Sequence, residues 1–575
     1  MRATGPPEVR GDMALIAGLV LLSAAFYPWN LGFYSDDWGI LSFLNASSDQ
    51  SLFGLLRSTF ETYPYRPGQA ANLAILYWLF GLAPVGFHLV NALVLAAIGP
   101  LLYLVLRECG QPRLIAVAVP LVFLCLPHYA TNRFWYASFA VPVCTVFYLF
   151  SLYADLRVVR PGRLHRLAWK ALAVGVLLAS ILTYEVWLPM FFVSPLLVWY
   201  RSRRELTPAT GPGVGLSLRS AVWLGLPTIL AIFAVTVYKV LLTTRLKSAT
   251  VAEHFTWFWA LLRDAVLTTL AGDFGLHLPA TLMQIVRYYP DALIAGLAIL
   301  CGAVVLGALL RADGGSGGAA LRPRPMLVLA AFGVFLFCAG YAIFLASFNA
   351  AVSSTGANNR SAIASSAGLA FVIVGLTGWL SSLIRPGGRR LLVFAGSLAL
   401  ACAIGVLIIN TVATFWIAAS ERQQQVLATL QEQVPELPPG TSLLLDGVCP
   451  YVGPAPVFET WWDMTGMLRI LYNDPSLAGD VVTRKVSLRE DGVYTRIYGD
   501  LVGPYPYEKL VVFNLQRGQL EPLPGPFAAR RYFEMNNPTG EGNCRPSTEG
   551  VGEALFVPGT PPVSRAPLAV AVTAP

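Results

Sequence analysis

The first 418 residues alternate between long apolar runs and short polar connections. Eleven of the runs are near 20 residues, long enough for a helix to cross about 30 Å of hydrocarbon. We therefore predict transmembrane helices at 13–29, 86–106, 114–131, 139–156, 168–183, 186–200, 220–243, 290–310, 327–347, 364–384 and 391–413. The pair 168–183 and 186–200 is short for two spans, because only Tyr184 and Glu185 separate them.

Lys and Arg are unevenly divided between the two sets of loops that alternate across these spans. The set that includes the N-terminus holds nineteen, and the opposite set holds eight. Because cytoplasmic loops carry the excess of Lys and Arg, we predict a cytoplasmic N-terminus. Loops 30–85 and 244–289 and the tail after residue 418 then face the extracytoplasmic side. Residues 69–80 and 256–271 in these loops are patterned as helices that lie in the membrane interface.

The chain becomes polar after residue 418, which predicts a second domain at 419–557 and a disordered tail at 558–575. Residues 421–432 predict an amphipathic helix that leaves the membrane. Strand-like runs at 442–446 and 509–515 lie among Pro, Gly and Asp turns, as in a small α/β or mostly β domain. An extracytoplasmic location permits a disulfide between Cys449 and Cys544. The sequence leaves this pairing open, because it does not show whether the two sulfur atoms approach each other.

Composition agrees with a polytopic α-helical membrane protein of about 11 transmembrane helices in the cell membrane. Of the 575 residues, 55% are hydrophobic and 13% are charged, against about 25% charged in soluble domains. Soluble, collagen-like, coiled-coil and disordered classes are thereby excluded. The net charge of +8 is explained by the Lys and Arg that gather in the loops on one side of the membrane. We therefore predict no nucleic-acid partner. The eight cysteines include no CxxC pair, so neither a zinc site nor a thioredoxin-type motif is indicated.

Two adjacent carboxylates, Asp36 and Asp37, follow the first predicted span within the segment Tyr34–Gly39. Such a pair at a membrane surface costs electrostatic energy unless its negative charge is used. A divalent cation would use it through oxygen ligands, and a hydroxyl nucleophile would use one carboxylate as a general base. The structural alternative is that Ser35 or Asp36 caps a helix starting near Trp38, which explains one acidic residue but not both.

Several cations lie near the same predicted membrane boundary, where a phosphate group would need them. Arg66 has a planar fork suited to phosphate, and Arg360, Arg245 and Lys239 are the further candidates. Lys239 lies four residues from the end of its span, so it is equally explained by snorkelling to the interface. His88 is placed at the same boundary, where intramembrane hydrogen bonding is the alternative to a role in the site.

The ordered set of these motifs resembles the C-type glycosyltransferase superfamily (GT-C) over residues 13–415. The resemblance rests on the acidic pair, Y-R-P at 65–67, G-L-x-P-x-G-F-H-L-V-N at 81–91, L-P-H at 126–128 and T-Y-E at 183–185. It is strongest toward the protein O-mannosyltransferase and lipid A aminoarabinose transferase branches. The tail matches no family of known activity.

The resemblance implies transfer of a sugar from a polyprenyl-phosphate carrier to a hydroxyl of a glycan, lipid or protein acceptor, on the extracytoplasmic face and with inversion. Asp36 or Asp37 would be the base and contact a divalent metal, and Glu185 would be a second acidic group that helps the metal or orients the acceptor. Arg66, His88, Arg360, Arg245 and Lys239 would bind the donor phosphate. Membrane lipids are the remaining expected partners.

The sequence leaves three other functions open. A transporter or flippase of lipid-linked saccharides would place ionisable groups in mid-membrane and show internal repeats, whereas here the acids gather at one surface. A polysaccharide ligase or polymerase would share the donor without needing the acidic pair. In an inactive membrane scaffold the tail would be the working part, and Glu459–Asp463 is its most site-like segment.

Overall fold

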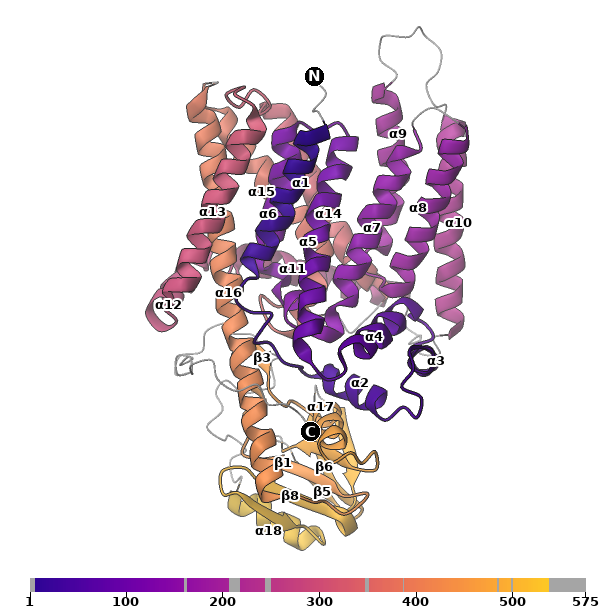
Figure 1. Ribbon diagram of the computed structural model, residues 1–575, viewed down its shortest axis with the longest axis vertical. Coiled ribbons are helices and arrows are strands. Elements are labelled where there is room, and N and C mark those ends of the chain that lie inside the picture. The colour runs from indigo at the N-terminus through magenta and orange to yellow at the C-terminus, as the bar shows by residue number, and fades with distance from the viewer. Residues whose placement is uncertain are drawn as a thin grey trace.

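The computed structural model describes residues 6–159, 163–205, 218–242, 250–346, 351–385, 387–482, 486–497 and 500–536. A helical bundle occupies most of the molecule, and a small domain with β-sheets is attached at one end (Figure 1). The bundle helices are α1 (Pro6–Ser23), α5 (Pro84–Glu108), α6 (Arg113–Cys125), α7 (Ala140–Arg157), α8 (Arg163–Thr183), α9 (Ser194–Glu205), α10 (Leu218–Leu242), α13 (Ala292–Asp313), α14 (Pro323–Tyr341), α15 (Ile363–Ser382) and α16 (Gly388–Gln433). Other helices are α2 (Asp36–Asn45), α3 (Leu52–Thr62), α4 (Pro67–Phe80), α11 (Val251–Ala271) and α12 (Leu278–Tyr288), with 3₁₀ helices η1 (Pro127–Arg133), η2 (Tyr136–Ser138), η3 (Leu188–Val193), η4 (Ala342–Ala346) and η5 (Ala357–Ala362).

Among the described residues, eight helices are long and apolar enough to cross a membrane, or nine if the bent pair α6–η1 is one span. The chain is therefore a multi-pass membrane protein, with fewer qualifying spans than the eleven predicted. The run at 13–29 does not qualify, because α1 starts earlier and includes Glu8, Arg10 and Asp12. The run at 186–200 does not qualify, because it is divided between η3 and α9. The predicted span 114–131 is broken by a 65° bend between α6 and η1.

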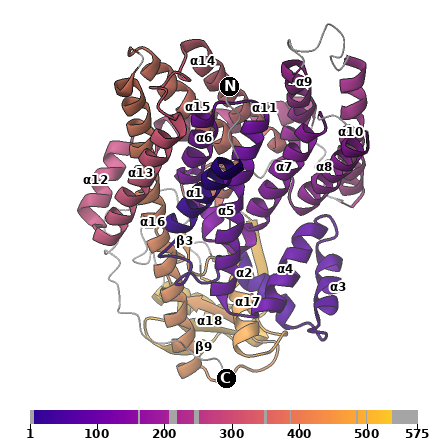
Figure 2. The ribbon, with the colours of Figure 1, turned by 45° about the horizontal axis from the view of Figure 1, so that its top comes forward.

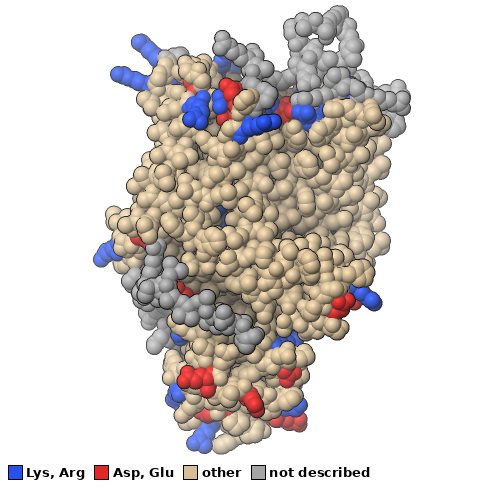
Figure 3. All heavy atoms as spheres, in the orientation of Figure 1, with Lys and Arg blue, Asp and Glu red and all other residues tan. Residues whose placement is uncertain are grey.

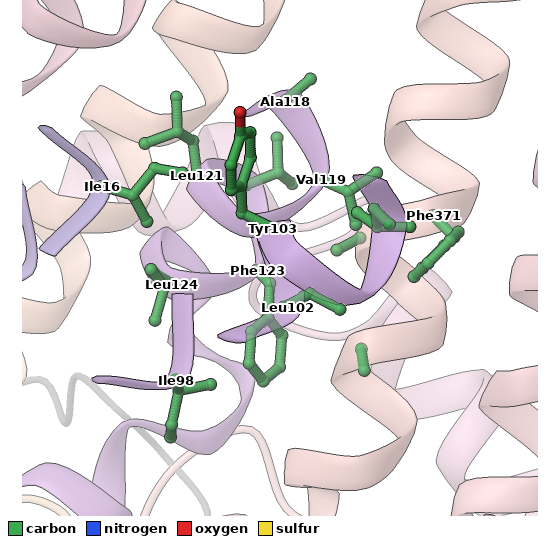
Figure 4. Close-up of a cluster of buried hydrophobic side chains, with 14 of the residues drawn as sticks. Ile16, Ile98, Leu102, Tyr103, Ala118, Val119, Leu121, Phe123, Leu124 and Phe371 are labelled. Carbon is green, nitrogen blue, oxygen red and sulfur yellow. The ribbon is translucent and has the colours of Figure 1, made fainter. Parts of the chain in front are cut away.

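The apolar core of the bundle explains why α1 still packs inside it. Ile16 of α1 is fully buried against α5 and α6, where Leu102 and Leu124 belong to the same cluster (Figure 4). The charged end of α1 is neutralised locally, since Asp12 forms an ion pair with Arg113 at 2.7 Å. Charged groups of α1 are thus kept at the end of the bundle rather than in its middle.

The outer surface of the bundle has the charge distribution of a membrane protein. In the view of Figure 3, a broad band is nearly free of charged side chains, and these gather at the upper rim and on the small domain. Helices α2, α3 and α4 lie at the end of the bundle that faces the small domain (Figure 2). The predicted helices at 69–80 and 256–271 are found as α4 and α11. Which end faces the cytoplasm stays a prediction.

The C-terminal domain is an α/β domain reached through one uninterrupted helix. α16 continues past residue 418 to Gln433, so the predicted helix 421–432 is the last part of a 46-residue helix. Strand order in the main sheet is β4-β1-β8-β9, with β1 parallel to β4 and β8 and with β9 antiparallel to β8. The elements are β1 (Ser442–Asp446), β2 (Tyr451–Val452), β3 (Ala455–Pro456), α17 (Trp461–Leu471), β4 (Ala478–Val481), β5 (Ser487–Arg489), β6 (Gly492–Ile497), β7 (Asp500–Tyr505), η6 (Tyr507–Lys509), β8 (Leu510–Asn514), β9 (Gln519–Pro522) and α18 (Pro526–Asn536).

The predicted strands at 442–446 and 509–515 correspond to β1 and β8. Cys449 is disulfide-bonded. Cys544 lies outside the described residues, as does the predicted disordered tail 558–575. The pairing of these two cysteines therefore stays a prediction.

The C-terminal domain is seated on the loop region of the bundle by a close contact between α17 and α2. A Cβ atom added to Gly466 of α17 would lie 2.4 Å from the backbone carbonyl of Trp38. On the opposite side of the contact, a Cβ added to Gly39 would lie 3.3 Å from the carbonyl oxygen of Trp462. The glycine at 466 therefore allows the two helix backbones to touch.

We expect Gly466→Ala to weaken this contact, although glycine-to-alanine changes within helices ordinarily stabilise by about 0.5–1 kcal/mol. The new methyl group meets backbone rather than a movable side chain, so an overpacking cost of about 1–3 kcal/mol is expected instead. Limited proteolysis of the purified protein should then release the C-terminal domain faster than from the wild type. Gly396→Ala in α16 is the matched control, because its Cβ would meet nothing within 4 Å. Equal proteolysis rates for both variants would show that the contact does not hold the domain.

Candidate functional site

A cavity of about 310 Å³ lies where the bundle meets α2, α4 and the C-terminal domain. Its volume is at the lower end of the range for small-molecule sites. Residues far apart in the sequence converge on it, and most of their side chains are charged, amide or aromatic. The charged, amide and aromatic residues among its lining are Asp36, Tyr63, Arg66, Gln69, Trp135, Tyr184, Arg360 and Trp462.

The two adjacent carboxylates occupy different environments in this site. Asp36 lines the cavity and is exposed to it. Asp37 is fully buried, and its two oxygens accept hydrogen bonds from the backbone N–H groups of Tyr34 (2.9 Å) and Ala137 (2.7 Å). Neither Ser35 nor Asp36 caps α2 through its side chain, so the capping alternative does not explain the pair. Asp37 holds the N-terminus of α2 in place, and Asp36 is the carboxylate available for chemistry.

The protein around the cavity removes water from near the Asp36 carboxylate, and this desolvation raises its pKa above the ordinary value, while the positive charge of Arg360 opposes the rise. The pKa of Asp37 is raised further by burial, against the lowering effect of its backbone hydrogen bonds. The position of both residues in the first turn of α2 favours negative charge there, because the helix dipole is positive at that end. A carboxylate with a raised pKa accepts a proton from a hydroxyl more readily than an aspartate with the ordinary pKa does.

Glu185 is held by two cations rather than facing the acidic pair. Arg66 binds it through Nε and Nη2 at 2.9–3.1 Å, and Lys239 forms a second ion pair with it. Burial works to raise the pKa of Glu185, but Arg66 and Lys239 outweigh it, so the pKa is lowered. The guanidinium of Arg66 also lies 4.1 Å from the ring centroid of Tyr184. These three charged residues form a cluster with one net positive charge at the edge of the cavity.

Arg360 is the cation whose charge acts on Asp36. Its guanidinium stacks over Trp135 at 4.4 Å from the ring centroid, and both residues line the cavity. Within the described part of the chain, no carboxylate lies within ion-pair distance of it. Arg360 therefore presents a cation to the cavity that no anion in these described segments neutralises by direct contact.

The remaining predicted phosphate ligands lie elsewhere. His88 is buried, and its Nε2 lies 2.9 Å from the carbonyl oxygen of Gly32, so it supports the segment leading to Asp36 without lining the cavity. Lys239 donates to the carbonyl oxygen of Ile181 at 2.6 Å as well as pairing with Glu185, so snorkelling alone does not account for it. Arg245 lies outside the described residues.

The predicted divalent metal stays a prediction, and the described residues offer it few protein ligands. The part of the chain that the structure describes holds no group of three or more His, Cys, Asp or Glu residues that could bind a metal ion. Both oxygens of Asp37 are occupied by backbone N–H groups, and Glu185 is occupied by two cations. Asp36 is left as the carboxylate that could contact a cation, and the other oxygen ligands would have to come from substrate phosphate and water.

The contribution of the C-terminal domain could not have been assigned from the sequence. Trp462 enters the cavity from α17, and its Nε1 donates to the hydroxyl of Ser35 at 3.2 Å. Glu459 also hydrogen-bonds to Ser35, the residue directly before Asp36. The segment Glu459–Asp463 is site-like by its composition, but only its contact with α2 connects it to the acidic pair.

A second, much larger cavity lies inside the bundle. Its volume is about 1090 Å³, and its lining is mostly apolar, from α5, α7, α9, α14 and α15. Trp187, two residues after Glu185, belongs to its wall together with Tyr148 and Phe371. This cavity offers space for a long apolar group beside the charged cluster.

Comparison with known proteins gives one structural match to report. No protein-family model and no curated protein matches this chain. A search of solved structures finds the crystal structure of ArnT from Cupriavidus metallidurans bound to undecaprenyl phosphate. The two chains are 18% identical, and the match covers 82% of this chain and 86% of that chain with a TM-score of 0.35.

Proposed function

We propose that this protein is an integral-membrane glycosyltransferase, which moves a glycosyl group from polyprenyl phosphate to an acceptor hydroxyl in the 310 Å³ cavity. The observation that carries the proposal is Asp36, a cavity-exposed carboxylate with a raised pKa that lines the same cavity as Arg360, whose guanidinium forms no ion pair within the described residues. A base and a phosphate-binding cation on the walls of one small cavity are what a sugar–phosphate displacement requires.

The proposed reaction is a single displacement. The acceptor hydroxyl attacks the anomeric carbon, a new carbon–oxygen bond forms there, and the hydroxyl proton passes to the Asp36 carboxylate. The bond between the anomeric carbon and the phosphate oxygen breaks, and its electron pair leaves with polyprenyl phosphate. Because attack and departure occur on opposite faces of the sugar ring, the anomeric configuration inverts.

Negative charge grows on the phosphate as the sugar leaves, and cations at that position lower the barrier. Arg360 suits this role best, since its planar guanidinium is already oriented by Trp135. Arg66 lines the same cavity, but its charge is shared with Glu185. We propose that the cluster of Arg66, Lys239 and Glu185 adds a weaker positive potential behind the phosphate.

The large apolar cavity supports a donor with a hydrocarbon carrier. An isoprenoid chain is apolar along its whole length, and the wall of this cavity is mostly aliphatic and aromatic. Trp187 places one end of the cavity close in sequence to Glu185, which pairs with the cavity-lining Arg66. The phosphate and the chain of one donor molecule would then occupy neighbouring spaces.

The proposal is tested by release of polyprenyl phosphate from a panel of labelled polyprenyl-phosphate sugars. The full-length protein is reconstituted in nanodiscs, with membrane extract supplying acceptors, and Glu61→Gln serves as a control because Glu61 is exposed and forms its ion pair with Arg57 on the surface. We expect release from at least one donor by the wild type and the control, with inversion at the transferred sugar. No release from any donor by correctly folded protein would overturn the proposal.

A further inference from the structure

A separate cavity of about 320 Å³ lies beside the catalytic one, between α2, α3 and the C-terminal domain. Its polar wall consists of the hydroxyls of Ser42, Ser47 and Ser58 and the side chain of Arg469. We call it the Arg469 cavity. Two structural units build it, because the serines belong to the loop 30–85 and Arg469 belongs to α17.

The Arg469 cavity and the catalytic cavity follow one another along the same pair of helices. Gly39 of α2 lines both. Asp36, Gly39 and Ser42 are spaced by three residues, which places them on one face of α2. On α17, Trp462 lines the catalytic cavity, and Arg469, seven residues later on the same face, lines the other. The Arg469 cavity is therefore the next one along α2 from Asp36, on the far side of the backbone contact between Gly466 and Gly39.

Arg469 has hydrogen-bonding capacity to spare in this position. Its Nε donates to the carbonyl oxygen of Leu477 at 2.9 Å, which fixes the plane of the guanidinium. In the described part of the chain its two terminal nitrogens have no protein partner and form no ion pair. Asp474, a nearby carboxylate whose pKa Arg469 helps to lower, accepts hydrogen bonds from Ser476. The guanidinium is thus oriented and available to an anion.

The chemistry of the wall defines the ligand class. Three hydroxyls match a polyhydroxylated ligand, and an oriented guanidinium matches a carboxylate or phosphate substituent in bidentate fashion. Ser42 donates to the carbonyl oxygen of Gly39 at 2.9 Å and Ser47 to that of Asp49 at 3.2 Å, so these two hydroxyls offer a ligand their acceptor lone pairs. The Arg469 cavity therefore fits a saccharide that carries a negative charge.

We propose that the Arg469 cavity binds the acceptor next to its reacting hydroxyl, and that this acceptor is an anionic saccharide chain. The inference rests on the proposed function, since it takes Asp36 as the base that receives the acceptor proton. The catalytic cavity of about 310 Å³ must hold the transferred sugar as well, so a longer acceptor has to continue outside it. The C-terminal domain, through Arg469, then selects the acceptor.

The test is direct binding of saccharide probes to the full-length protein in nanodiscs, followed by calorimetry. The probes are mannopentaose 6-phosphate, the same pentaose after removal of the phosphate, tetragalacturonate and inorganic phosphate. We expect one or both charged saccharides to bind at least tenfold more tightly than neutral mannopentaose and than inorganic phosphate. The charged saccharide that binds more tightly identifies the substituent as phosphate or carboxylate.

Two variants test the location of this binding. Arg469→Ala removes the cation, and Ser58→Trp fills the cavity from α3 while leaving Arg469 in place. Each is expected to weaken charged-saccharide binding at least tenfold. Arg57→Ala is the matched control, since Arg57 is an exposed cation on the same helix as Ser58 and should bind like the wild type.

Three binding results would contradict the inference. Equal binding by the wild type, Arg469→Ala and Ser58→Trp would place the saccharide elsewhere, and inorganic phosphate binding as tightly as the saccharides would exclude a saccharide site. No binding of any probe would also overturn it. Asp36→Asn keeps the Arg469 cavity intact and should bind normally, so loss of donor turnover and loss of this site are separate results.

Discussion

Asp36→Asn is expected to lower kcat for polyprenyl-phosphate release by about 10²–10⁴-fold, the usual contribution of a general base. Asparagine has nearly the shape of aspartate but does not accept a proton at neutral pH. Asp36 makes no hydrogen bond that α2 depends on, and its side chain faces the cavity. The thermal stability of the variant should therefore remain within about 0.5 kcal/mol of wild type, as for surface substitutions. Initial rates with the reactive donor, together with thermal unfolding in detergent, measure both quantities.

Asp37→Asn is the matched comparison, because it makes the same chemical change one residue later. An amide at this position would point its NH₂ group at one of two backbone N–H donors, Tyr34 or Ala137, and leave that donor unsatisfied. The expected result is a loss of stability of about 1–3 kcal/mol. Wild-type kcat in Asp36→Asn, or a stable and inactive Asp37→Asn protein, would show that Asp37 rather than Asp36 is the base.

The sequence predicted the architecture where a local signal was sufficient. Apolar runs identified most spans, and the short apolar run at 442–446 among turn residues identified β1, because a helix or strand that buries its own side chains shows this in its pattern. Breaks inside the spans were not visible. Pro100 and Pro120 lie within continuous helices, whereas Pro127 starts η1 after a 65° bend, so proline alone does not mark a break.

The sequence also singled out those residues of the candidate site that are neighbours along the chain. Asp36 and Asp37 are neighbours in the sequence, so the pair was evident, but their separate roles depend on which oxygens the backbone of Ala137 reaches. Glu185 was expected to help a metal or orient the acceptor, yet Arg66 and Lys239, which are 119 and 54 residues away, pair with it. Partners at such distances in the chain are set by helix packing, which a single sequence does not show.

Arg360→Ala is expected to reduce kcat by about 10²–10³-fold, as for removal of one donor that stabilises developing negative charge. The side chain contacts Trp135, and the hydrogen bond from Asn132 reaches only the backbone carbonyl of Arg360, so the fold should be retained. Arg360→Lys keeps the charge but loses the planar fork, and an intermediate rate is expected. Arg263→Ala, which removes an exposed cation paired with Asp264, is the control and should behave as wild type.

The pH dependence of kcat/KM distinguishes an electrostatic role of Arg360 in the site from a purely structural role. Asp36 accepts a proton only when it is ionised, so kcat/KM should fall as the pH drops through the pKa of Asp36. Burial raises that pKa, which places the acid limb above the value near 3.9 of a free aspartate. Arg360 lowers the same pKa, so Arg360→Ala should move the acid limb to higher pH, Arg360→Lys should move it less, and Arg263→Ala should leave it unchanged. An acid limb that does not move in Arg360→Ala would mean that Asp36 and Arg360 do not act across one cavity. A shifted limb with a reduced kcat would show that Asp36 and Arg360 are coupled electrostatically and serve the same reaction.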